Sequence, residues 1–188
     1  MNSLFNFLNR IATWKTVLPL LVLYVSFPAY WLKNAEDTIN QLAGKRIGPI
    51  DLTFGFNPAR TLAMIADYGP AARSFYARTE LTTDVIYPLV YSTLLSLLLT
   101  MLFRNKPNRL FIGLPFFTLL LDYLENAAIV TLLNTYPTQS TGVAVLCEVV
   151  KLAKWLSFGV VIGLIGYGLI LKAINRTNRM DTVVKDPR

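Results

Sequence analysis

The stretch that decides the fold lies near the C-terminus, where residues 155–171 read WLSFGVVIGLIGYGLIL without a single charge. A helix needs about 20 mostly apolar residues to cross the roughly 30 Å hydrocarbon core of a bilayer. Residues 17–32 and 85–103 are also free of charge, and residues 110–133 contain only two acidic side chains. The sequence therefore predicts one all-α membrane domain over residues 1–188, with four transmembrane helices at about 14–32, 83–103, 110–133 and 141–172.

The composition excludes most soluble enzyme classes. Hydrophobic residues make up 54% of the 188-residue chain and charged residues only 15%, against about 25% in an average soluble domain. The chain has no histidine, which excludes His-ligated metal sites and Ser-His or Cys-His nucleophiles. Its one cysteine, Cys147, excludes an internal disulfide. We expect neither a metal nor a cofactor.

The first apolar stretch has an alternative interpretation as a signal peptide with Arg10 and Lys15 as its basic flank. Small residues are preferred at positions −3 and −1 of a cleavage site. Phe27 and Ala29 would occupy these positions, and Phe27 fits poorly. The pattern favours a retained membrane helix.

Basic residues predict the orientation of the bundle in the membrane. Ten basic residues and only two acidic ones lie in three segments. These are the N-terminal segment, the link at 104–109, and the tail at 173–188 together with Lys172 just before it. The connection at 33–82 is nearly balanced, with six basic and five acidic residues. The positive-inside rule then predicts a multi-pass cell-membrane protein with both termini cytoplasmic. Because the basic residues have no aromatic platform beside them, we expect membrane lipids rather than nucleic acid as their partner.

The connection at 33–82 is expected to form an outer amphipathic segment. Asn57-Pro58 is a typical helix start and predicts a helix over 59–68. Gly69-Pro70 ends that helix and predicts another over 71–80. The two helices would cover the outer mouth of the bundle or, alternatively, rest on lipid headgroups. Residues 3–13 predict a short interfacial helix on the cytoplasmic surface.

Ionisable residues inside the predicted membrane helices are the candidate functional groups, because each costs about 2.5–3.5 kcal/mol to insert. They recur at helical spacing on three helices, so that each set shares one face. The sets are Asp84, Tyr87 and Tyr91; Thr118, Asp122, Glu125 and Asn126; and Glu148, Lys151 and Trp155. At 1.5 Å per residue all three fall in the outer half of the membrane. We expect a funnel that is wet at Glu148 and Arg73, narrows toward Asp122 and ends above a dry cytoplasmic half.

Two carboxyls one turn apart should repel each other. We expect Lys151 to pair across the bundle with Glu125 or Asp122, so that one acid stays ionised and the other keeps its proton. Such a pair can perform acid–base chemistry without histidine, and it equally suits a proton-coupled carrier. The alternative is a polar network that only fixes which helices pair and in which register.

These observations predict a pocket that binds or converts a lipophilic, lipid- or isoprenoid-like molecule. Its candidate catalytic residues are Asp122, Glu125 and Lys151. Its candidate ligand-binding residues are Arg73, Tyr76, Asp84, Tyr87, Tyr91, Asn126 and Glu148.

Several motifs together carry a resemblance to a known group of proteins. They are Gly69-x3-Arg73-x2-Tyr76, then Asp84, Pro88 and Tyr91, then Asp122-x2-Glu125-Asn126, and finally Pro137 and Lys151. In this order they resemble a family of small, mostly bacterial four-helix integral membrane proteins that has no assigned function. The resemblance covers about residues 50–155 and implies that these positions form one site. It supplies no substrate.

Two other functions stay open at this point. Gly159 and Gly163 allow a neighbouring helix to approach closely, which suits a structural or accessory subunit, or a homo-oligomer. A small proton- or cation-coupled transporter is the other alternative, although the dry cytoplasmic half argues against a path through one chain.

Overall fold

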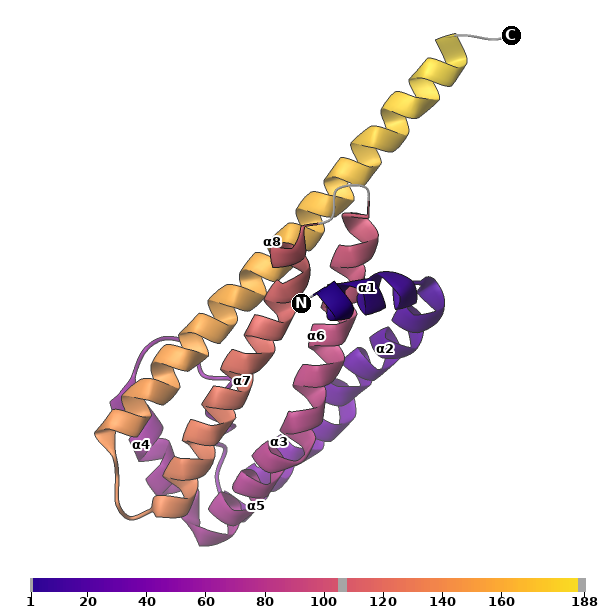
Figure 1. The fold of residues 1–188 in the computed structure, drawn as a ribbon. Helices are drawn as coiled ribbons and strands as arrows, with labels where there is room; N and C mark the ends of the chain where they lie inside the picture. Colours follow the sequence, from indigo (N-terminus) through magenta and orange to yellow (C-terminus); the bar gives the residue numbers. More distant parts are fainter. Residues whose placement is uncertain (1, 105–107, 186–188) are drawn as a thin grey trace.

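The computed structural model describes residues 2–104 and 108–185, and all regular structure in this part of the chain is helical (Figure 1). The elements are α1 (Asn2–Ile11), α2 (Trp14–Ser26), the π-helix η1 (Phe27–Leu32), α3 (Lys33–Ala43), α4 (Pro58–Asp67), α5 (Gly69–Leu81), α6 (Thr83–Leu102), α7 (Arg109–Thr135) and α8 (Thr141–Lys185). Four segments within the described residues are long and apolar enough to cross a membrane: Trp14–Ala43, Gly69–Leu102, Arg109–Thr135 and Thr141–Ile174. The all-α class and the four long apolar helices are confirmed.

The first long helix extends beyond its expected end at residue 32. Pro28 cannot donate a backbone hydrogen bond, and the helix widens at this point into η1 before continuing as α3. Although α3 is polar, Ile39 on its inner face is only 2% exposed. The helix ends at Gly44, whose φ of 69° is the left-handed conformation that favours glycine after a helix.

The two helices expected in the outer connection are present as α4 and α5. The side chain of Asn57 caps α4 by accepting a 2.9 Å hydrogen bond from the backbone N–H of Arg60. Gly69, with φ of 71°, separates α4 from α5. Both helices pack on the bundle, α4 against α8 and α5 against α7 and α3. A short break at Thr82 is all that divides α5 from α6.

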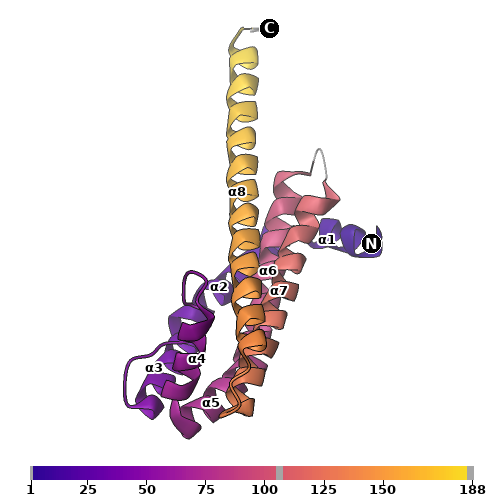
Figure 2. The ribbon, with the colours of Figure 1, turned by 90° about the vertical axis from the view of Figure 1, so that its left-hand side faces the viewer.

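The last helix is much longer than the membrane helix expected at 141–172. α8 has 45 residues, which corresponds to about 68 Å, and its C-terminal part projects beyond the other helices (Figures 1 and 2). The helix therefore continues into the segment expected to be a basic tail. Residues 186–188 of that tail lie outside the described part of the chain.

The two ends of the bundle differ. One, here called the capped end, carries α3, α4, α5 and the connection at 44–57, and the other, the terminal end, carries α1 and both chain termini (Figures 1 and 2). An apolar cluster fills each end, with Ile65 and Ile129 in the capped end and Leu97 and Val161 in the terminal end. Along the helices, the buried aspartates, glutamates and lysines lie between the two clusters.

Candidate functional site

A buried lysine of α8 brings together two carboxylates of α7. The Nζ of Lys154 lies 3.0 Å from Oδ1 of Asp122 and also forms an ion pair with Glu125. Asp122 and Glu125 can both reach this lysine because residues three apart on a helix share one face. The hydroxyl of Tyr91 on α6 donates a 2.7 Å hydrogen bond to Oδ2 of Asp122. Side chains of three helices therefore meet at one carboxylate.

The expected pairing of Lys151 with Asp122 or Glu125 is wrong. The Nζ of Lys151 donates instead to Oε1 of Glu148 over 2.7 Å and to the hydroxyl of Thr53 over 2.6 Å. Lys151 and Lys154 share a face of α8, but about 4.5 Å along the helix axis separates them. Lys151 is the one nearer the capped end, so it meets the connection at 44–57, and Lys154 meets Asp122.

Glu148 forms a clamp between α8 and the start of α4. Its Oε2 accepts a 2.9 Å hydrogen bond from the backbone N–H of Asn57, and its Oε1 accepts a 2.6 Å hydrogen bond from the hydroxyl of Thr61. The residue is 1% exposed, so the expectation that it marks a wet mouth is wrong. Donors at the N-terminus of α4 bind the Glu148 carboxylate, which water would do at an open mouth.

Arg73 does not lie at the mouth of a pocket, which is the position expected from the sequence. Its guanidinium donates a 3.1 Å hydrogen bond to the carbonyl of Ile65 and lies 3.8 Å from the ring centroid of Tyr136. A cation over an aromatic face is a favourable contact. Arg73 therefore joins α5 to α4 and to the end of α7, and it lines neither of the cavities described below.

Tyr76 places the connection at 44–57 against the bundle. Its hydroxyl accepts a 2.8 Å hydrogen bond from the backbone N–H of Ile50 and donates one of 2.9 Å to Oδ1 of Asp51. The neighbouring hydroxyl of Tyr68 donates to the carbonyl of Gly48 over 2.7 Å. Burial raises the pKa of Tyr68, so that this phenol keeps the proton it donates. Two phenols thus hold the connection on the bundle, and one of them, Tyr76, binds the Asp51 carboxylate.

Asp84 is held from α7 by an amide. The Nδ2 of Asn126 donates to the backbone carbonyl and to Oδ2 of Asp84, over 3.1 Å in both cases. The hydroxyl of Tyr123 donates a further 2.8 Å hydrogen bond to the carbonyl of Val85. These bonds fix the start of α6 on α7, so the Asp84 carboxylate has a defined position.

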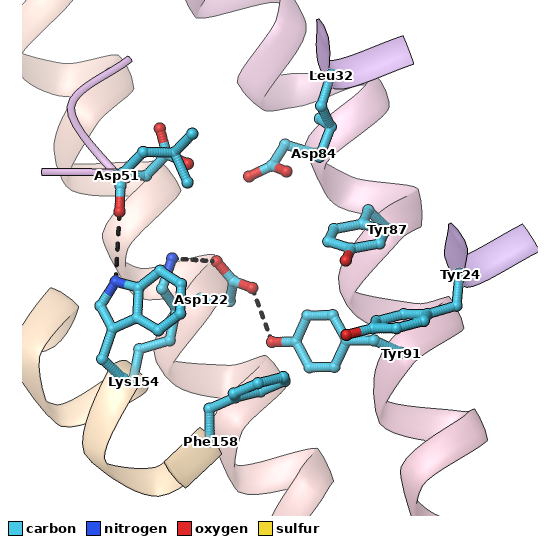
Figure 3. Close-up of a pocket in the computed structure, with 11 residues that line it drawn as sticks. Tyr24, Leu32, Asp51, Asp84, Tyr87, Tyr91, Asp122, Lys154 and Phe158 are labelled. Carbon is cyan, nitrogen blue, oxygen red and sulfur yellow. Dashed lines mark hydrogen bonds and ion pairs between the residues drawn. The ribbon is translucent and has the colours of Figure 1, made fainter. Parts of the chain in front are cut away.

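A cavity of about 220 Å³, here called the site cavity, lies beside these groups (Figure 3). Three carboxylates line it, Asp51 from the connection, Asp84 from α6 and Asp122 from α7, together with Lys154. Figure 3 shows Asp84 and Asp122 directed toward the same space, with Asp51 on a facing wall. The cavity also contacts Leu52, which is 53% exposed, so it lies close to the outer surface.

Five aromatic side chains form a continuous part of the wall. They follow one another through ring contacts, with centroid separations of 5.9, 5.6, 5.9 and 6.2 Å in the order Tyr24, Tyr87, Tyr91, Phe158 and Trp155. The rings come from α2, α6 and α8. The site cavity therefore has one apolar, polarisable wall and one group of carboxylates.

A second cavity of about 250 Å³, here called the adjoining cavity, shares part of this wall. Asp51, Asp84, Tyr87 and Trp155 line both spaces. The adjoining cavity extends toward α3 and α5 and adds Tyr76 and Glu80. Glu80 is 2% exposed, and its Oε2 has no hydrogen-bond partner within the described residues.

The residues expected to form one site therefore divide into two groups. Asp84, Tyr87, Tyr91 and Asp122 line the site cavity, and Tyr76 lines the adjoining one. The others stand behind the walls or in the contacts between helices: Arg73, Glu125, Asn126, Glu148 and Lys151. Glu125, which is 0% exposed, reaches the site only through Lys154.

Sequence reasoning missed the ionisable cavity residues Asp51, Glu80 and Lys154, and the aromatic wall residues Tyr24, Trp155 and Phe158. Glu80 carries a usable signal, because it lies four residues before Asp84 on nearly continuous helices. Lys154 carries a similar signal, because it lies about one helical turn after Lys151 on the same face of the predicted helix. Asp51 has none, since it belongs to a connection without helical periodicity.

The terminal half of the bundle beneath the site is closely filled. Thr118 and Ser157 share a 2.7 Å hydrogen bond just below Asp122, and the apolar cluster around Leu97 and Val161 follows. Gly159 and Gly163 lie on the outside of α8, where an added Cβ at either position would meet no atom within 4 Å.

No protein-family model, no curated protein and no solved structure matches this chain. The resemblance to small four-helix membrane proteins therefore stays a prediction.

Proposed function

We propose that this protein resides in the cell membrane and binds a lipophilic small molecule in the site cavity, with the polar end of that molecule at the carboxylates that line the cavity. The observation that carries the proposal is the composition of the wall, three carboxylates facing a continuous run of five aromatic rings. Ligand pockets are typically apolar, with a few placed polar groups that fix orientation. The site cavity has both an apolar wall and placed polar groups.

The size of the cavity limits what it encloses. About 220 Å³ is smaller than the roughly 300–1,000 Å³ of pockets that enclose a whole drug-sized ligand. It suits a polar head or a single ring system, with the rest of the molecule lying along the apolar outer surface past the half-exposed Leu52. A lipid- or isoprenoid-like molecule has this division into a compact head and a long apolar part.

In a second form of this proposal, the protein also converts the bound molecule chemically. Asp122 meets the geometric requirement for a catalytic acid or base, because it lines the cavity and keeps hydrogen-bond donors on both oxygens. Glu125 does not line the cavity, and it acts as a positioning residue for Lys154. Any acid–base chemistry would therefore use Asp122 with Asp84, in place of the Asp122–Glu125 pair expected from the sequence.

The location of the charges supports the proposed orientation. The start of α1, the end of α6, the start of α7 and the C-terminal part of α8 lie at the terminal end of the bundle (Figure 1), and the lysines and arginines of the sequence are concentrated in and next to these segments. On the positive-inside rule the terminal end faces the cytoplasm and the site cavity opens in the outer half of the membrane. The filled terminal half disfavours transport through one chain.

Native mass spectrometry of protein extracted gently from membranes tests this proposal. Asp122→Asn should lose a co-purifying lipophilic molecule that the wild type retains, because the substitution changes the cavity wall. Glu125→Gln is the matched control, since it removes the same charge from the same lysine but lies behind the wall. Equal retention by the wild type and both variants would contradict the proposal.

A further inference from the structure

The two cavities hold more acidic than basic groups. Lys154 is already shared by Asp122 and Glu125, and Lys151 is paired with Glu148. Asp51, Glu80 and Asp84 receive no ion pair from any described residue. Within the described part of the chain, the carboxylates of Asp51 and Asp84 accept hydrogen bonds only from uncharged side chains, a phenol and an amide. The space between these three acids therefore lacks a balancing positive charge.

Among these acids, Glu80 gives the strongest indication of a missing partner. It is 2% exposed, its Oε2 has no hydrogen-bond partner in the described structure, and it lines the adjoining cavity together with Asp51 and Asp84. Buried polar atoms in native proteins are nearly always paired, and an exception is a sign of a missing partner. A donor or a cation placed in the cavity would satisfy this oxygen.

The aromatic wall points to the kind of cation. The faces of tyrosine and tryptophan rings attract ammonium groups, and cages of such rings recognise alkylated ammonium ligands. Tyr87 and Trp155 line both cavities, so a cationic group near Asp84 has rings beside it as well as carboxylates. A small metal ion fits less well, since no three Asp, Glu or Cys side chains among the described residues converge closely enough to hold one.

We infer that the ligand is a lipophilic ammonium compound, whose positively charged group lies between Asp51, Asp84 and Glu80 and whose apolar part lies against the ring wall. The inference rests on the proposed function and specifies the chemical class of its ligand. An anionic headgroup would be repelled from the same space, and an uncharged one would leave the carboxylates without a partner.

Three probes of matched shape test the inference: a dodecyl trimethylammonium salt, its uncharged carbon isostere and dodecyl sulfonate. Trp155 lines both cavities, so its fluorescence reports occupancy once Trp14 and Trp31 are replaced by Phe. Titrations in uncharged maltoside micelles should give a saturable change in Trp155 fluorescence with the ammonium compound, at about tenfold lower concentration than with the isostere, and none with the sulfonate.

The outcomes separate the inference from the proposed function. Equal affinity for the ammonium compound and its isostere would overturn the inference and leave the proposed function standing, as would tightest binding of the sulfonate. A saturable fluorescence change with none of the three would contradict both.

Substitutions in the cavity walls test whether the preference for the ammonium compound arises there. Asp84→Asn and Glu80→Gln keep the shape of the wall and should each reduce the preference for the ammonium compound over the isostere several-fold. Asp67→Asn is the control, because Asp67 pairs with Lys45 on the surface at 52% side-chain exposure. If all three variants keep the wild-type preference, the charge preference does not arise in these cavities and the inference is wrong.

Discussion

The Nζ of Lys154 lies 3.0 Å from Oδ1 of Asp122, although the two residues belong to different helices and both are about nine-tenths or more buried. The same ammonium group also pairs with Glu125. One positive charge thus serves two acids between the apolar ends of the bundle. Removing one partner of a buried ion pair is strongly destabilising, because it leaves an uncompensated charge.

Lys154→Met should therefore lower the free energy of unfolding by about 3–5 kcal/mol. Asp122→Asn should have a much smaller effect, because Lys154 then keeps Glu125 as its partner. Thermal unfolding in maltoside micelles, followed by circular dichroism, measures the difference. Lys45→Met is the control: its surface pair with Asp67 is half-exposed, and we expect a change below about 1 kcal/mol. A Lys154→Met protein that unfolds at the wild-type temperature would refute this role for Lys154.

Glu148 should hold α4 on the bundle. Glu148→Ala removes the acceptor for both the Asn57 N–H and the Thr61 hydroxyl, so backbone amides of α4 should exchange with deuterium at least about tenfold faster. Amides of α7 should be unaffected. Asp37→Ala serves as the control, since Asp37 pairs on the surface with Lys33 of its own helix. Unchanged exchange in α4 would mean that its other contacts are enough to hold it without Glu148.

Gly69 should be required for the turn between α4 and α5. Its φ of 71° is unfavourable for a residue with a Cβ, so Gly69→Ala should destabilise the protein by about 1–2 kcal/mol although the added methyl meets no atom within 4 Å. Gly113→Ala is the matched case, because Gly113 lies inside α7 with similar free space. We expect it to stabilise the protein by about 0.5–1 kcal/mol. Equal effects of the two substitutions on the unfolding temperature would argue against a conformational role for Gly69.

The features that follow from hydrophobic periodicity could be predicted from the sequence. Charge-free runs predict the number of long helices, and Asn57-Pro58 and Gly69-Pro70 predict the starts of α4 and α5. Spacing along α7 correctly puts Asp122 and Glu125 within reach of one lysine. The continuation into α3 could not be predicted from apolarity, because a polar helix with one buried face can follow a membrane segment without interruption.

The missing part of the site depends on positions that periodicity does not determine. Lys151 and Lys154 share a face of α8, and a depth estimate uncertain by one helical turn does not distinguish them. Asp51 reaches the cavity through hydrogen bonds from Tyr76 and Trp155, contacts between segments that are distant in the sequence. The place of Asp51, and the choice of Lys154 over Lys151 as the partner of Asp122, therefore depend on the three-dimensional packing.

The most direct test of a lipophilic ligand in the site cavity is photoaffinity labelling with an alkyl amine that carries a diazirine, followed by mass spectrometry of the labelled peptides. We expect labels on cavity residues such as Tyr24, Tyr87 and Phe158, and the labels should disappear when excess unlabelled amine is added. Labels confined to the exposed outer face of α8, at residues such as Leu156 and Val160, and insensitive to competition would contradict binding in the cavity.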